Sequence, residues 1–236
     1  MIDVAVVEAL LARLYLGGGA PRKEERKKAQ EVADLLGLVA GTIAQPVPRG
    51  RPRTLVDAAA GHGYVGLCAA ALLGWRKIVA IERDPERAER VRAAAARLDV
   101  VVDLDVRAAS LGEGAMPAET DVVVALHACG PATDAVLAEA SASGARWILC
   151  APCCYGATVP GWEEARKDAD ARGLDEGAAV RGRYAAALVD SARLHRLRAA
   201  GYDAQLVSFT APTVTPHHLA FKARRGGAVA VLVNGR

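Results

Sequence analysis

Histidine, cysteine and tyrosine side chains follow two apolar runs of this sequence, at the point where each run ends. After the run VVVAL come His127, Cys129, Thr133 and Asp134, and after the run WILCA come Cys153, Cys154 and Tyr155. Each run is typical of a buried parallel strand that leads into a polar loop. In open α/β sheets, ligands bind beyond the carboxyl ends of the strands. The two loops therefore predict one crevice lined with reactive groups.

These side chains fit more than one kind of chemistry. His127 could act as a base, contact a bound cofactor or pack in the core, and Asp134 could contact a substrate or, with Thr133, cap the N-terminus of a helix. A cysteine thiolate is a poor base while its thiol keeps the ordinary pKa of about 8.5. Histidine and cysteine also bind zinc, but adjacent cysteines after an H-x-C pair are not a standard finger spacing. We therefore expect no metal, and cysteines that simply pack small loops are a further alternative.

A glycine-rich turn lies upstream, in LVDAAAGHGYVGL at residues 55–67. An apolar strand delivers Asp57, small residues with Gly61 and Gly63 follow, and a helix begins directly after them. Glycine lets the backbone approach a ligand closely. The next strand ends in Glu82, and an acid in that position can accept both hydroxyl groups of an adenosine ribose. The combination predicts a nucleotide- or nucleoside-binding site.

The pattern Asp-x-Ala-x-Gly-x-Gly, with an acid ending the second strand, resembles motifs I and II of class I S-adenosylmethionine-dependent methyltransferases. From Ala59 the turn reads AxGxG, and the sequence has no Walker A motif. The resemblance implies S-adenosyl-L-methionine as cofactor, with its amino-acid end near Asp57 and its ribose on Glu82. Ala59 stands where these enzymes commonly have glycine, which is tolerable if φ at this residue is not positive. The residues that the resemblance assigns to the cofactor are Asp57, Ala58, Ala59, Gly61, Gly63, Tyr64, Glu82, Arg83, Asp105, Leu126 and His127.

The two reactive clusters extend this resemblance. HACGPATD and PCC look like a branch that includes Trm13-type tRNA 2′-O-methyltransferases and the RRNAD1-like and GSTCD-like proteins. The stretches RKKAQEV (26–32) and TPHHLAFKA (215–223) resemble segments of the same branch, although His217 and His218 replace a usual Lys-Asn pair. The zinc-binding fingers of the Trm13 type are absent, so tRNA specificity does not carry over automatically. In such enzymes the residues after the fourth strand line the methyl-transfer site, and the catalytic candidates are His127, Asp134, Cys153, Cys154 and Tyr155.

Alternating strand and helix patterns must position these motifs. Strands are predicted at residues 54–59, 77–82, 100–104, 121–126 and 146–151, and helices at 2–16, 21–39, 64–73, 85–97, 131–141 and about 183–200. This alternation indicates βαβ units and a parallel sheet. The resemblance implies a Rossmann-like, doubly wound α/β fold whose mostly parallel seven-stranded sheet ends in an antiparallel hairpin from residues 203–233, with 218–223 pairing 228–233. We expect a helical N-terminal extension over residues 1–50 and the methyltransferase domain over 51–236.

Composition narrows the class of protein. The 236 residues are 52% hydrophobic and 4% aromatic, which suits a core built mainly from Ala, Val and Leu. Five cysteines, two of them adjacent, favour reduced thiols and a cytoplasmic location over a disulfide framework. No apolar run approaches the length of a membrane span, and the first residues lack the basic segment of a secretory signal. The net charge of +3 is small, and the basic residues at 21–28 fit a solvated helix face better than a nucleic-acid surface.

The sequence thus predicts S-adenosylmethionine-dependent methyl transfer, with RNA of the tRNA kind as the favoured acceptor. Methyl transfer from a sulfonium is an in-line substitution, in which the protein mainly positions the nucleophile. The alternatives are a methyltransferase acting on a protein or a small molecule, and a catalytically inactive cofactor-binding module that acts through partners. The partner we expect is the methyl acceptor, and no membrane partner is expected.

Overall fold

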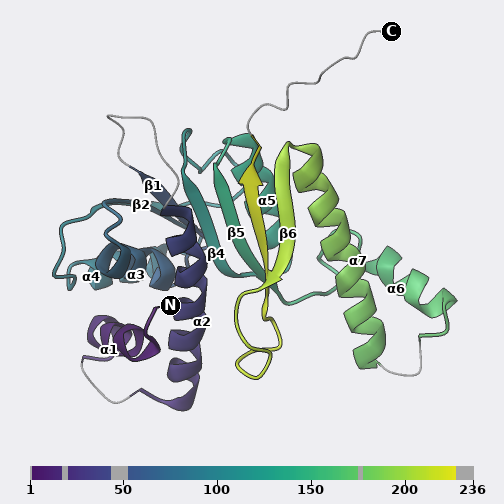
Figure 1. Ribbon diagram of the computed structural model, residues 1–236, viewed down its shortest axis with the longest axis horizontal. Helices are drawn as coiled ribbons and strands as arrows, with labels where there is room; N and C mark the ends of the chain where they lie inside the picture. Colours follow the sequence, from purple (N-terminus) through teal and green to yellow (C-terminus); the bar gives the residue numbers. More distant parts are fainter. Residues whose placement is uncertain (1, 18–20, 44–52, 175–177, 227–236) are drawn as a thin grey trace, which may run out of the picture.

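Seven strands form one sheet in the computed structural model, which describes residues 2–17, 21–43, 53–174 and 178–226 (Figure 1). The strands are β1 (Thr54–Ala58), β2 (Lys77–Glu82), β3 (Asp103–Ala108), β4 (Val122–Cys129), β5 (Trp147–Cys153), β6 (Tyr202–Ser208) and β7 (Leu219–Arg225). Their order is β3-β2-β1-β4-β5-β7-β6; β1 to β5 are parallel, and β7 is antiparallel to both of its neighbours. The predicted doubly wound fold with an antiparallel C-terminal pair is confirmed.

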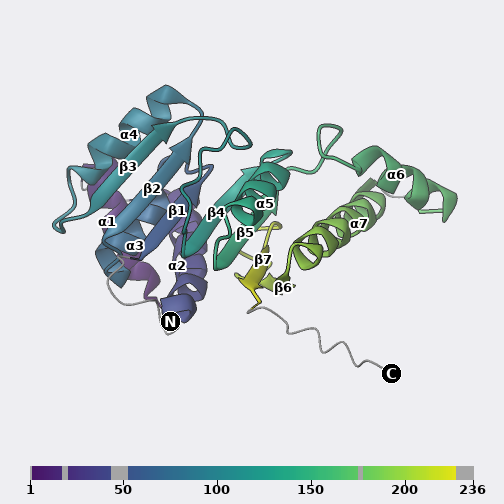
Figure 2. The same cartoon turned by 90° about the horizontal axis from the view of Figure 1, so that it is seen from above.

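Helices cover both faces of the sheet (Figure 2). They are α1 (Val4–Tyr15), α2 (Lys23–Ile43), α3 (Tyr64–Leu73), α4 (Pro85–Ala95), α5 (Ala132–Ala142), α6 (Trp162–Ala171) and α7 (Ala178–Ala199). Helices α1 to α4 pack in one apolar layer, and α5 and α7 pack in the layer on the opposite face. Helix α6 packs on α7 in a small cluster of its own, beyond the edge of the sheet. Among the described helices, none is long and apolar enough to cross a membrane.

The central strands are mostly apolar, as expected of strands that are covered on both faces. In β4, Val122 and Val124 pack in the layer of α1 to α4, whereas Val123 and Ala125 pack in the layer of α5 and α7. The two N-terminal helices share the first of these layers with the sheet. The boundary predicted near residue 50 lies outside the described residues.

Four element predictions need correction. The third strand runs over 103–108 instead of 100–104, because it is an edge strand that pairs only with β2 and alternates Leu104 and Val106 toward the core. Helix α2 continues to Ile43, past the glycine at which it was expected to end. Helix α6 was not predicted, although Trp162 and Ala165 form its buried stripe. The antiparallel pair joins 202–208 to 219–225, and the predicted strand 228–233 lies outside the described residues.

Candidate active site

A cavity of about 770 Å³ lies beyond the carboxyl ends of the parallel strands. This is the edge at which open α/β sheets bind ligands. Its lining comes from the loops after β1, β2, β3 and β4 and from α2. The residues that line it are Lys28, Asp57, Ala59, Ala60, Gly61, His62, Tyr64, Val65, Ile81, Glu82, Arg83, Arg87, Ala109, Ser110, Leu111, Leu126, His127, Cys129, Pro131, Ala132, Ala135 and Thr158.

Two buried carboxylates hold the glycine-rich turn. Asp57 at the end of β1 accepts a hydrogen bond from the amide of Gly66 (2.8 Å), which fixes the start of α3. Glu82 at the end of β2 accepts from the amides of Gly61 (2.8 Å) and Asp84 (3.0 Å), one on each oxygen. A carboxylate oxygen has two acceptor positions, so Glu82 keeps acceptor capacity toward the cavity. Burial raises the pKa of Asp57 to about 7, with Glu82 adding to the rise and the Gly66 amide opposing it.

The turn itself has a strained and a crowded position. Ala59 has φ +52°, so the condition under which alanine would be tolerable here is not met. Gly63, which comes directly before α3, has φ +73°, and a Cβ there would lie 2.8 Å from a methyl carbon of Val91. Non-glycine residues in the left-handed region concentrate at functional sites. The strain at Ala59 thus marks the loop that lines the cavity.

Helix α1 contributes to the same wall through an aromatic group. The hydroxyl of Tyr15 donates to the carbonyl of His62, and its ring packs edge-on against Tyr64 (4.8 Å between centroids). The rings of His62 and Tyr64 are stacked at 5.3 Å. Helix α1 therefore braces the turn from behind.

His127 occupies a β-bulge at the end of β4, opposite the glycine-rich turn. The register shifts between Leu126 and Ala128, and His127 has φ +60°. Its Nε2 lies 3.0 Å from Oε2 of Glu31, a buried carboxylate of α2 that also accepts from Nζ of Lys28 (2.6 Å). Burial would raise the pKa of Glu31, but the hydrogen bonds from His127 and Lys28 outweigh it and lower that pKa to about 2. The bulge and α2 thus hold His127 in one orientation.

Sequence reasoning named neither Lys28 nor Glu31 as a site residue. The signal was present, since both lie in the stretch RKKAQEV that resembled a segment of the methyltransferase branch. The contact of Glu31 with His127 depends on how α2 packs on β4, which no local pattern reveals. His217 also lies beside this group, with its ring centroid 6.4 Å from that of His127.

Three cysteine thiols meet next to His127. The Sγ of Cys129 lies 2.7 Å from the Sγ of Cys153 and 3.4 Å from the Sγ of Cys154. Burial and the neighbouring thiols raise the pKa of Cys153, and burial raises that of Cys129. The thiols of Cys129 and Cys153 are therefore poor bases at neutral pH. Of the three, Cys129 lines the cavity.

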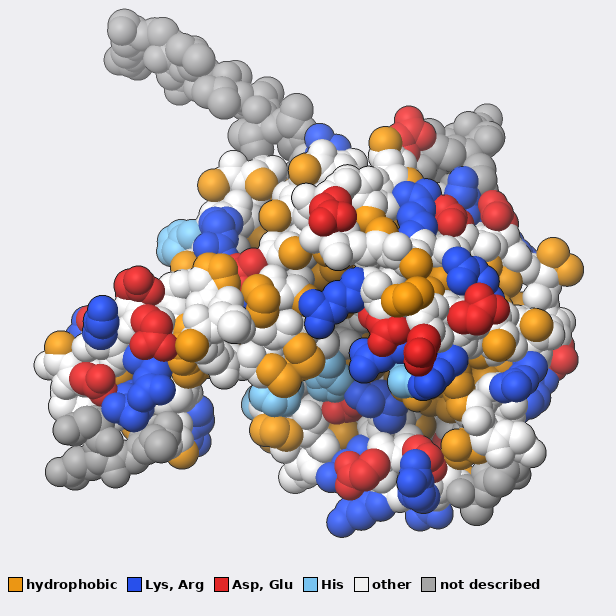
Figure 3. All heavy atoms as spheres, turned by 180° about the vertical axis from the view of Figure 1, so that it is seen from behind, with side chains coloured by type: hydrophobic (Ala, Val, Ile, Leu, Met, Phe, Trp, Pro, Cys, Tyr) orange, Lys and Arg blue, Asp and Glu red, His pale blue; other side chains and the backbone are white. Residues whose placement is uncertain are grey.

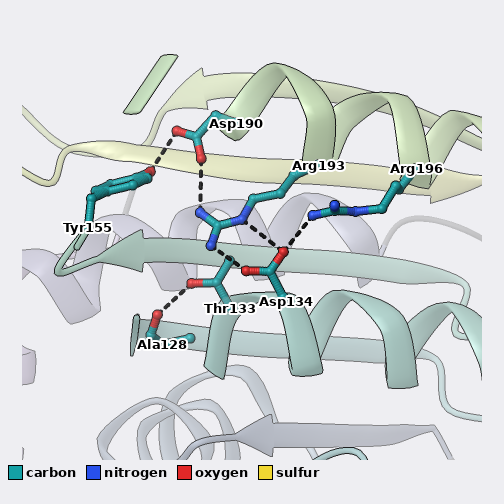
Figure 4. Close-up of polar contacts among 7 residues, drawn as sticks. All are labelled: Ala128, Thr133, Asp134, Tyr155, Asp190, Arg193 and Arg196. Carbon is teal, nitrogen blue, oxygen red and sulfur yellow. Dashed lines mark hydrogen bonds and ion pairs between the residues drawn. The ribbon is translucent and has the colours of Figure 1, made fainter. Parts of the chain in front are cut away.

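Asp134 and Tyr155 do not line the cavity, unlike our expectation for catalytic residues. Figure 4 shows both in a buried network with α7. Arg193 donates to Asp134 (2.6 Å) and to Asp190 (3.1 Å), and the hydroxyl of Tyr155 donates to Asp190 (2.6 Å). Arg196 pairs with Asp134 from the exposed side. Asp134 carries the acidic charge of the first turn of α5, as in the alternative of a helix-terminal charge. The expected capping by Thr133 is wrong, because Thr133 lies inside α5 and its hydroxyl donates to the carbonyl of Ala128. The network anchors α7 to the strand ends.

Three residues assigned to the cofactor also lie outside the cavity lining. Ala58 is fully buried in β1, and Gly63 packs against α4. Asp105 lies on β3 and pairs with Arg107 (2.8 Å). The other predicted cofactor residues all line the cavity.

Basic side chains near the site are mostly paired. Arg22 pairs with Glu25, Lys27 with Glu24 and Arg26 with Glu8. These ion pairs fit the solvated helix face predicted for the basic segment. On the face opposite to the view of Figure 1, Lys and Arg are interspersed with Asp and Glu (Figure 3).

Comparisons with known proteins agree with this fold. A family model described as a methyltransferase domain matches residues 27–158. The glutathione S-transferase C-terminal domain-containing protein of Xenopus laevis is 32% identical over 136 residues, which are 55% of this chain and 20% of that protein. Its Homo sapiens counterpart is 26% identical over 211 residues, or 80% of this chain and 32% of that protein. The chain thus spans between a fifth and a third of the length of these relatives.

A solved structure with a TM-score above 0.5 shares the fold at low sequence identity. A chain of the fibrillarin/Nop5p complex has a TM-score of 0.51 at 13% identity and covers 82% of this chain and 83% of its own. A methyltransferase from Pyrococcus furiosus has a TM-score of 0.49 at 14% identity and covers 93% of this chain and 94% of its own.

Proposed function

The chain belongs to the methyltransferase domain family, and from that membership we propose that it transfers the methyl group of S-adenosyl-L-methionine to RNA. The observation that carries the proposal is the set of residues that line the cavity beyond the strand ends. The glycine-rich turn with Glu82 forms one side, and Lys28, His127 and Cys129 form the other. A donor and an acceptor bound on the two sides would meet at the end of β4.

The donor side fits S-adenosyl-L-methionine. Glu82 has acceptor positions left for ribose hydroxyl groups, since each of its oxygens receives one backbone amide. Apolar groups of Ile81, Ala109 and Leu111 suit a flat purine. When bound, the cofactor supplies an electrophilic methyl group on a sulfonium. Asp57 lines the cavity at the end of β1, and its carboxyl would favour the cationic end of the cofactor when it is ionised, which burial opposes.

The acceptor side is organised around His127. A carboxylate only accepts hydrogen bonds, so the nitrogen that faces Glu31, Nε2, carries the hydrogen. In the neutral ring, Nδ1 is then the acceptor. His127 lines the cavity and could take the proton that an acceptor hydroxyl or amine loses on methylation. Positioning the nucleophile supplies the larger part of the acceleration.

Two observations support RNA as the acceptor. The cations Lys28, Arg83 and Arg87 line the cavity, where they would meet phosphate groups, although Lys28 also pairs with Glu31 and Arg87 with Asp84. The motif resemblance to the Trm13-type branch points the same way. A reducing compartment such as the cytoplasm is the location that we propose, because the five cysteines are free thiols.

Calorimetric titration tests the donor half. Wild type should bind S-adenosyl-L-methionine and its demethylated product. Glu82→Ala should weaken both by at least about 10-fold, since a hydrogen bond to a charged group contributes about 1.5–3 kcal/mol. Glu86→Ala, which removes an exposed carboxylate of α4, is the matched control and should bind like wild type. Absence of binding to the wild type, or equal binding by Glu82→Ala, would refute the donor assignment.

Labelled cofactor tests the acceptor half. The protein should transfer the labelled methyl group to an RNA fraction, and ribonuclease treatment of that fraction beforehand should abolish the transfer. Label that enters only proteins or metabolites would reject RNA while leaving methyl transfer in place. Binding without any transfer to the three fractions would favour the inactive binding module.

A further inference from the structure

The thiols of Cys129, Cys153 and Cys154 form a cluster that the proposed methyl transfer does not use. Their three Sγ atoms all lie within 4.8 Å of one another. Cys129 ends β4, Cys153 ends the neighbouring strand β5, and Cys154 follows directly. Cys129 and Cys153 are register partners across the two parallel strands.

Two strained backbone positions bring the sulfurs together. The bulge at His127, with φ +60°, shifts the register so that Cys129 pairs with Cys153. Cys154 has φ +56°, which L side chains rarely adopt. Each left-handed residue costs about 1–2 kcal/mol. An interaction formed by the cluster would have to offset this cost.

Packing of neutral thiols does not account for the geometry. The 2.7 Å between Cys129 and Cys153 is well inside the contact distance of two unbonded sulfur atoms. A disulfide between these two would relieve that contact, but it would leave the third thiol, on its strained residue, without a role. A cation that all three sulfurs share accounts for every member of the cluster.

We propose that Cys129, Cys153 and Cys154 bind a thiophilic divalent cation, zinc, as three thiolates at the edge of the cavity. Zinc–sulfur bonds of about 2.3 Å in a tetrahedral site place sulfurs about 3.8 Å apart. The 3.4 Å between Cys154 and Cys129 is close to this separation, whereas Cys129 and Cys153, at 2.7 Å, would have to move apart by about 1 Å when the ion binds. Binding releases the thiol protons to solvent, so three S–H bonds are exchanged for three Zn–S bonds without oxidation.

The fourth position of the metal is left open by the protein. Among the described residues, the cluster contains no further histidine, cysteine, aspartate or glutamate ligand. Three protein ligands and one exchangeable ligand are typical of catalytic zinc sites, whereas structural sites have four protein ligands. Because Cys129 lines the cavity, the exchangeable ligand would face the space that the acceptor enters.

Elemental analysis of the full chain tests the site without any assay of activity. The chain is purified with a non-thiol reductant, incubated with zinc sulfate, desalted, and compared with a chelator-treated sample. We expect about one zinc ion per chain after incubation. Cobalt in place of zinc should give thiolate-to-cobalt charge-transfer absorption, which reports sulfur ligation directly.

The variant Cys154→Ser is the most informative because this side chain is exposed and its loss leaves the core intact. It should weaken zinc binding by more than about 100-fold. Mutation of a residue that merely hydrogen-bonds to a metal-binding side chain already lowers metal affinity by about 10–100-fold, and Cys154 would bind the metal itself. Cys150→Ala, a thiol of the same strand in the core, is the matched control and should keep wild-type binding. Zinc content near zero after incubation, or full zinc affinity in Cys154→Ser, would overturn the proposal. Three titratable thiols instead of five, without metal, would assign a disulfide instead.

Discussion

Replacing Arg193 with methionine tests whether the network in Figure 4 is a structural anchor. Arg193 is 1% exposed and provides the cation for Asp190, whose side chain is 6% exposed. Removing one partner of a buried ion pair typically costs about 3–5 kcal/mol, because the other charge is left buried. For a chain of this size each kcal/mol lowers the melting temperature by about 2–4 °C. Arg193→Met should therefore lower it by roughly 6–20 °C.

A control variant and a double variant distinguish the effect of the unpaired Asp190 charge from a simple loss of packing. Arg196→Met removes a cation that is 57% exposed from the same Asp134, and should cost no more than about 1 kcal/mol. The double variant Arg193→Met/Asp190→Asn removes the stranded charge. It should recover about half of the lost stability or more, as measured by urea unfolding of all four proteins.

The pH dependence of the Arg193→Met deficit has a defined sign. Burial raises the pKa of Asp190 above its ordinary value, and Arg193 opposes that rise. Without Arg193 the carboxyl is protonated more readily, so the deficit should be largest at alkaline pH and should shrink on acidification. A deficit below about 1 kcal/mol, or a double variant no more stable than Arg193→Met, would refute the reasoning.

Three further predictions concern the cavity wall. Ala59→Gly should raise the free energy of unfolding, measured in urea, by about 0.5–1 kcal/mol. The strain of alanine at φ +52° in the folded state is larger than the extra conformational entropy that glycine loses on folding. A lower free energy of unfolding would contradict this. The pKa of Asp57 is raised to about 7, so folding favours its protonated form. Relative to Asp57→Asn, the wild type should therefore lose stability as pH rises from about 4 to 7, by up to about 1.4 kcal/mol per pH unit. If the stability of the two proteins changed with pH in parallel, burial of the Asp57 charge would be refuted. The pKa of Glu31, about 2, has the opposite effect: its stabilisation is present above pH 4.5 and is lost as pH falls toward 2, and Glu31→Gln should lack this part of acid unfolding.

Local sequence patterns were sufficient to predict the bounds of elements that are buried along most of their length. The start of β1 and both ends of α3 follow from a continuous apolar run and a glycine turn, and the structure places them at the predicted residues. Strand β3 and helix α6 differ, because one is an edge strand and the other buries its stripe against α7 instead of the sheet. The positions of their apolar residues depend on the elements that they pack against, which lie elsewhere in the sequence.

The site divides in the same way. Glu82 and the glycine turn could be predicted because strand ends on one edge of a parallel sheet must converge. Asp134 and Tyr155 could not be placed correctly, since their partner Arg193 comes from α7, some 40–60 residues downstream. The contact of Glu31 with His127 likewise depends on how α2 packs on β4.

The packing of α2 on β4 and β5 has a consequence for biosynthesis. Helix α2 ends at Ile43, and the last of the two strands that it contacts ends at Cys153, about 110 residues later. At about 5–20 residues per second, the ribosome needs roughly 5–20 s to deliver the covering strands. During that interval the apolar side chains of Val32, Leu35 and Leu36, which end up in the core, lack these strands as cover. The nascent N-terminal helices are therefore a segment in which we expect chaperones to bind before the sheet closes over them.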